Sequence, residues 1–73
     1  MTQGNYWEAI KLLKVAKSLK PDEGLIYIQL GKNYLAVGDK ENALGILRQG
    51  QNLAANAAQK QVINDLMQKI QGY

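Results

Sequence analysis

The chain has 73 residues, with nine basic and six acidic side chains, and it contains neither cysteine nor histidine. This length allows one small domain at most, and the composition excludes disulfide bonds, thiolate metal sites and histidine-based catalysis. The net charge of +3 is compatible with nucleic acid or an acidic peptide as a partner, but it is not a strong electrostatic indication of either. No apolar run approaches the roughly 18 residues of a membrane span, so we expect no membrane-spanning segment.

The spacing of apolar residues predicts two helices in the first half of the chain. The first spans about residues 6–19, with Asn5 as its N-cap and Pro21 shortly after its end. The second spans about residues 22–37, with acidic residues in its first turn and Gly38 just beyond its end.

The same spacing predicts two further helices in the second half. The third spans about residues 40–53 and is capped by Asp39, and the fourth spans about residues 56–71. The connections between predicted helices are short, so neighbouring helices are expected to run antiparallel. The sequence therefore predicts an all-α fold.

The first and third predicted helices repeat one another at a constant offset of 34 residues. Four residues recur unchanged at this offset, namely Gly4, Ala9, Leu13 and Leu19 as Gly38, Ala43, Leu47 and Leu53. A 34-residue period of paired helices is the signature of the tetratricopeptide repeat (TPR). The second helix carries the family's aromatic-x-x-Leu-Gly-x-x-Tyr pattern as Tyr27, Leu30, Gly31 and Tyr34, and Gly38-Asp39 matches its turn.

The chain thus resembles the TPR family over residues 4–55. The resemblance implies a half repeat at 4–21, a full repeat at 24–55 and a capping helix at 56–71, arranged as antiparallel pairs of a right-handed superhelix. It also implies that Gly31 lets the following helix approach closely, facing small residues such as Ala43 and Gly50. Two features depart from the family: Ala54-Ala55 replaces the usual proline, and the fourth helix lacks the first-helix motif.

We expect no enzyme activity, no metal and no cofactor. Four of the acidic residues lie at predicted helix starts, where carboxylates favour the helix dipole: Asp22, Glu23, Asp39 and Glu41. The only aliphatic hydroxyls belong to Thr2 and Ser18, and no histidine is present to activate them. No glycine-rich loop follows a predicted strand, so no phosphate-binding loop is indicated.

The resemblance implies a protein or peptide partner on the concave face formed by the first helix of each repeat. The residues projected onto that face are Leu25, Ile28, Lys32, Leu35 and Ala36. Ile28 and Lys32 stand where carboxylate-binding members of the family have lysine and asparagine, so that clamp is not implied. The apolar composition favours an apolar or amphipathic segment. The alternative is that neighbouring repeats or the capping helix cover these residues.

Four lysines recur every three residues along the first helix: Lys11, Lys14, Lys17 and Lys20. A solvated outer face explains them better than nucleic acid does, because no arginine cluster or interleaved aromatic residue accompanies them. A weak nucleic-acid or anionic-surface binder is therefore a distant alternative. Trp7 is either an exposed contact residue or a ring lying over Ile10 or Lys11. The absence of cysteine fits a reducing compartment such as the cytoplasm and is compatible with others.

The first helix has no partner in the chain for one of its apolar stripes. This stripe, with its neighbours, consists of Trp7, Ala9, Ile10, Leu13 and Ala16. Either the chain is part of a longer array, or it covers the stripe by forming a homo-oligomer. We favour the longer array, since such arrays normally need about three repeats for stability. Self-association through this stripe is the alternative function to peptide binding.

Overall fold

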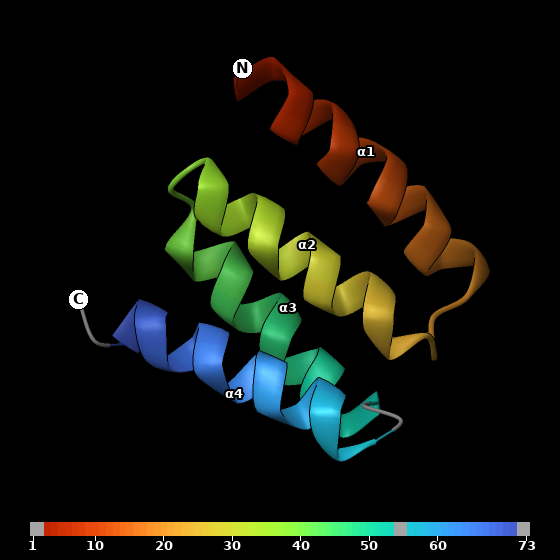
Figure 1. Ribbon diagram of the computed structural model, residues 1–73. Helices are drawn as coiled ribbons and strands as arrows, with labels where there is room; N and C mark the ends of the chain where they lie inside the picture. The colour runs from red at the N-terminus through yellow and green to blue at the C-terminus, as the bar shows by residue number, and fades with distance from the viewer. Residues whose placement is uncertain (1–2, 54–55, 72–73) are drawn as a thin grey trace.

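The computed structural model describes residues 3–53 and 56–71, which form four α-helices and no strand (Figure 1). In chain order these are α1 (Gln3–Leu19), α2 (Gly24–Ala36), α3 (Lys40–Leu53) and α4 (Ala57–Gln71). The all-α fold predicted from the sequence is therefore confirmed. Ala54 and Ala55, where the TPR pattern departs from the family, lie outside the described residues. No helix in the described part of the chain is long and apolar enough to cross a membrane.

α2 is the central helix of the fold. It packs against α1, α3 and α4, and α4 also packs against α3, whereas α1 packs on α2 alone among the four helices. Figure 1 shows that the chain reverses its direction at each of the three connections between helices. The molecule measures 33 × 32 × 19 Å, so the helices form a flat body in which α1 lies at one edge. The superhelical handedness expected for a TPR array stays a prediction.

The start of α3 is built as the sequence predicts. Oδ1 of Asp39 accepts a hydrogen bond from the Asn42 backbone N–H at 3.2 Å, and Oδ2 accepts one from the Asn42 side-chain amide at 2.7 Å. Asp39 is thus the N-cap, which satisfies a backbone donor that the helix itself leaves unpaired. The N-cap of α4 is similar, because Oδ1 of Asn56 accepts a hydrogen bond from the Gln59 N–H at 2.9 Å.

Two predicted helix starts are wrong. α1 begins at Gln3, so Asn5 lies inside the helix instead of capping it. An asparagine inside a helix costs less than about 0.7 kcal/mol relative to alanine, which is too little to fix where a helix begins. α2 begins at Gly24, and Glu23 is its N-cap residue without a side-chain hydrogen bond. The acidic residues therefore precede α2 and do not form its first turn.

A left-handed glycine ends α2. Gly38 has φ +84°, its N–H donates to the Leu35 carbonyl at 3.0 Å, and the Asp39 N–H donates to the Tyr34 carbonyl at 2.9 Å. These two hydrogen bonds are the Schellman pattern, which requires a residue that tolerates positive φ just beyond the helix. The turn brings α3 back against α2 only three residues after α2 ends.

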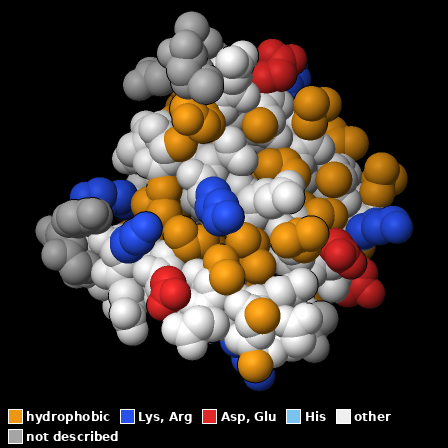
Figure 2. Space-filling view, in the orientation of Figure 1, with side chains coloured by type: hydrophobic (Ala, Val, Ile, Leu, Met, Phe, Trp, Pro, Cys, Tyr) orange, Lys and Arg blue, Asp and Glu red, His pale blue; other side chains and the backbone are white. Residues whose placement is uncertain are grey.

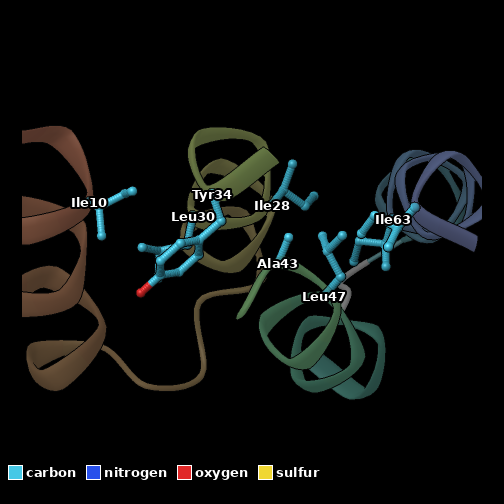
Figure 3. Packing of buried hydrophobic residues seen from close by; sticks show 8 residues of the cluster. Ile10, Ile28, Leu30, Tyr34, Ala43, Leu47 and Ile63 are labelled. Carbon is cyan, nitrogen blue, oxygen red and sulfur yellow. The ribbon is translucent and has the colours of Figure 1, made fainter. Parts of the chain in front are cut away.

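The core is a cluster of buried apolar side chains to which all four helices contribute (Figure 3). Ile10 of α1 points toward Leu30 and Tyr34 of α2, and Leu47 of α3 lies near Ile63 of α4 in the same view. Leu30, Leu47 and Ile63 are completely buried. The packing accounts for most of the stability of such short helices, which are marginal in isolation.

Two glycines allow α2 and α3 to approach closely. A Cβ atom added to Gly31 would lie 2.5 Å from Cδ2 of Leu47, and one added to Gly50 would lie 2.8 Å from Cβ of Tyr27. Both distances are too short for real side-chain contacts, so a side chain at either position would force Leu47 or Tyr27 to shift. The predicted close approach at Gly31 is confirmed, but the nearest side chain is Leu47 and not a small residue.

Tyr27 fixes the connection between α1 and α2. Its hydroxyl donates to the Pro21 carbonyl at 2.6 Å, and its ring lies 5.8 Å from Nζ of Lys17 on α1. Tyr27 is buried, with 4% of the residue's surface exposed. The first aromatic residue of the TPR-like pattern therefore contacts the turn before α2, the helix before that turn, and Gly50 of α3.

Candidate peptide-binding groove between α2 and α4

A groove of about 370 Å³ lies where α2, α3 and α4 meet. It is lined by Lys32, Leu35, Ala36, Lys40, Leu66 and Lys69. We call it the α2–α4 groove, because five of these six residues belong to those two helices. Its volume falls within the range of roughly 300–1,000 Å³ that is common for ligand pockets.

The floor of the groove is apolar. Leu35 and Leu66 are partly buried and pack against the core cluster, so their positions follow from the packing of α2 on α4. Ala36 is exposed beside them and adds little bulk. Because a small residue stands at the end of α2, the groove stays open at a place where a larger side chain would fill it.

The rim of the groove is positively charged. Lys32, Lys40 and Lys69 line it, and no aspartate or glutamate does. All three lysines are exposed, and neither Lys32 nor Lys69 forms an ion pair with another described residue. Figure 2 shows Lys or Arg side chains standing beside hydrophobic side chains on the face seen in Figure 1. An apolar floor beside the ammonium groups of Lys32 and Lys69 favours a ligand that is both apolar and anionic.

The structure brings together three of the five residues that the sequence assigned to the concave face. Lys32, Leu35 and Ala36 line the groove. Ile28 does not, because it is only 4% exposed and belongs to the core cluster, so its assignment as a contact residue is corrected. Leu25 is 46% exposed but lies outside the groove lining.

Sequence reasoning missed three lining residues, namely Lys40, Leu66 and Lys69. The 34-residue offset contains a signal for two of them. Leu66 stands 34 positions after Lys32, and Lys69 stands 34 positions after Leu35. α4 therefore lies beside α2 with equivalent positions of the period facing the same groove, although α4 lacks the first-helix motif.

The apolar stripe that the sequence assigned to self-association is only partly exposed to solvent. Ile10 is 4% exposed and lies in the core cluster, so it cannot take part in a self-association surface. Ala9, Leu13 and Ala16 are partly buried, and Trp7 is 49% exposed. The most exposed apolar residues of α1 are instead Leu12 at 65%, Val15 at 57% and Leu19 at 77%. The exposed apolar side of α1 therefore contains Leu12, Val15 and Leu19, which the sequence-based assignment did not include.

The lysines of α1 do not form one continuous outer face. Lys11, Lys14 and Lys20 are exposed, but Lys17 is partly buried over the ring of Tyr27. A three-residue spacing rotates by about 60° per step around a helix, so four such lysines point in different directions. Three of these lysines therefore face solvent, and Lys17 contacts α2.

Other site chemistry is sparse in the described chain. No three acidic side chains among residues 3–53 and 56–71 come close enough to hold a metal ion. No protein-family model, curated protein or solved structure matches the chain. The case for any function therefore depends on the residues and geometry described above.

Proposed function

We propose that this chain is a protein-interaction module of the TPR type that binds a peptide segment in the α2–α4 groove, without a catalytic reaction or a cofactor. The groove itself carries the proposal, since it is concave, apolar at its floor and lined by two helices at equivalent positions of a 34-residue period. The TPR-like motif of α2 supports it, because its residues Tyr27, Leu30, Gly31 and Tyr34 are all buried.

The lining also suggests the chemistry of the bound peptide. Leu35 and Leu66 offer an apolar surface to one or two aliphatic or aromatic side chains. Lys32 and Lys69 would attract a carboxylate placed next to those side chains. The expected ligand is therefore a short segment in which apolar and acidic residues alternate or adjoin.

The test begins with selection of peptides from a displayed random library on the immobilised chain, followed by fluorescence anisotropy with the selected peptides. Lys32→Glu and Ala36→Glu place negative charge in the groove, and both positions are exposed, so the fold should persist. Lys60→Glu is the matched control, because Lys60 is exposed on α4 outside the groove lining.

We expect the two groove variants to weaken binding about tenfold or more, and the Lys60→Glu control to leave the affinity nearly unchanged. Circular dichroism checks that each variant keeps its helical content. The proposal fails if no peptide is enriched above background. It also fails if the groove variants and the control bind the selected peptides equally well.

A further inference from the structure

Two exposed apolar residues outside α1 lie on the same sides of their helices as the residues that line the α2–α4 groove. Leu25 on α2 is 46% exposed, and Val62 on α4 is 37% exposed. Leu25, Lys32 and Ala36 lie within about 40° of one another around α2, because their spacing is seven and then four residues. Val62 precedes the two groove residues of α4 by four and seven residues, so it lies on the groove side of that helix as well.

These two residues extend the groove lining toward the N-terminal ends of α2 and α4. The two helices run in the same direction, because the chain reverses at each connection (Figure 1). The groove lies in the C-terminal half of both, and Leu25 and Val62 lie nearer their N-terminal ends. We call the groove together with Leu25 and Val62 the α2–α4 surface. Along α2 it is about 16 Å long, with a basic end at Lys32 and Lys69 and an apolar end at Leu25 and Val62.

A helical ligand suits this surface better than a strand does. The backbone N–H and C=O groups inside α2 and α4 pair within those helices, so they cannot pair with the backbone of a bound strand. Residues 3–53 and 56–71 contain no sheet edge to which a strand could add. A bound helix satisfies its own backbone groups and presents apolar side chains every three or four residues along one side. A length of about 16 Å corresponds to about three turns of such a helix.

The lysines favour one direction for the bound helix. Lys32 and Lys69 attract carboxylates at their end of the surface. Carboxylates stabilise a helix in its first turn and destabilise it in its last turn, because of the helix dipole. A bound helix whose first turn lies beside the two lysines runs antiparallel to α2 and α4. Its later turns then place apolar side chains against Leu25 and Val62.

We propose that the α2–α4 surface binds an amphipathic helix of a partner protein, about three turns long and antiparallel to α2, with acidic residues in its first turn. This inference rests on the proposed function, since the acidic turn occupies the groove described above. It adds the conformation of the ligand, its direction, and a second apolar contact at Leu25 and Val62.

Substitutions at the apolar end test the second contact. The probes are peptides of about 16 residues, long enough for four helical turns, selected from a displayed library on the immobilised chain. Leu25→Gln and Val62→Gln should each weaken binding about twofold to tenfold in fluorescence anisotropy, because each removes apolar surface that the ligand covers. Leu12→Gln and Val15→Gln are the matched controls, since they remove exposed side chains of the same kind from α1. Circular dichroism checks that all four variants stay helical.

A nitroxide label at either end of the selected peptide tests its direction on the ¹⁵N-labelled chain. A label at the N-terminus should broaden the amide signals of Ala36 and Lys69 most strongly. A label at the C-terminus should broaden those of Leu25 and Val62 instead. The circular dichroism of the mixture should show more helix than the sum of the separate spectra, because the peptide becomes helical when it binds.

The outcomes separate this inference from the proposed function. If Lys32→Glu weakens binding but Leu25→Gln and Val62→Gln do not, the proposed function stands and the inference fails. The inference also fails if the helical signal does not rise on mixing, or if the two labels give the reverse pattern. If Lys32→Glu leaves the affinity unchanged, the proposed function fails and the inference fails with it.

Discussion

Leu47 of α3 lies directly over Gly31 of α2, so closely that a Cβ atom at Gly31 would be 2.5 Å from its Cδ2 atom. Leu47 is completely buried. A glycine inside a helix normally costs about 1 kcal/mol relative to alanine. At this position the cost is offset because the missing side chain leaves room for Leu47 of α3 to pack against α2.

We expect Gly31→Ala to destabilise the chain by about 1 kcal/mol, because overpacking at Leu47, which typically costs about 1–3 kcal/mol, exceeds the gain in helix propensity. Gly45→Ala is the matched control, because a Cβ added at Gly45 would meet nothing within 4 Å beyond its chain neighbours and the backbone of its own helix. That control should stabilise the chain by about 0.5–1 kcal/mol. Urea denaturation measures both changes. Equal stabilisation by the two substitutions would contradict the close contact between Gly31 and Leu47.

Tyr27→Phe should lower the free energy of unfolding by about 0.5–1.5 kcal/mol, because the Pro21 carbonyl loses its hydrogen bond from the Tyr27 hydroxyl. Tyr34→Phe is the comparison, since Tyr34 is equally buried and its hydroxyl forms no hydrogen bond with another described residue. Thermal denaturation followed by circular dichroism compares the two. A larger loss for Tyr34→Phe would show that the hydroxyl of Tyr27 does not stabilise the α1–α2 turn.

Asp39→Ala should destabilise the chain by about 1 kcal/mol, because α3 loses the N-cap that bonds to Asn42. Asp39→Asn should lose much less, since an asparagine side chain can still accept the hydrogen bond from the Asn42 backbone N–H. Urea denaturation at neutral pH separates the two variants. If the asparagine variant is as unstable as the alanine variant, the cap is not the source of the effect.

Peptide binding in the α2–α4 groove should weaken as salt rises, because the lysine rim is exposed and its attraction is screened. Lys69→Gln should reduce affinity about twofold to fivefold at low salt and should have a smaller effect at high salt. Lys60→Gln removes a lysine of α4 that lies outside the groove and should change little. Fluorescence anisotropy at several salt concentrations measures the difference. An affinity independent of salt would argue against a carboxylate in the ligand.

The helices themselves could be predicted well from local sequence. Asp39 caps α3 at the expected residue, and Gly38 ends α2 with the expected positive φ, because both effects depend on a few neighbouring atoms. The start of α1 could not be predicted in this way. Asn5 carries a preference for capping, but that preference is too weak to stop a helix that continues to Gln3.

The site was harder to predict because it depends on contacts between distant helices. Periodicity places Ile28 on an apolar side of α2, but it does not say that packing leaves only 4% of Ile28 exposed. Leu66 and Lys69 enter the groove only because α4 packs beside α2. Leu66 and Lys69 follow residues of α2 by 34 positions in the sequence. Because α4 lacks the first-helix motif, this offset alone did not predict that they line the groove.

The most direct test of the peptide-binding account is a titration of the ¹⁵N-labelled chain with a selected peptide, followed by amide chemical shifts. The account predicts that the largest shifts fall on Lys32, Leu35, Ala36, Leu66 and Lys69, which line the α2–α4 groove. Ala36→Glu should abolish these shifts at the same peptide concentration while leaving the spectrum of the other helices unchanged. Shifts confined to α1, or a spectrum that does not change at saturating peptide, would contradict it.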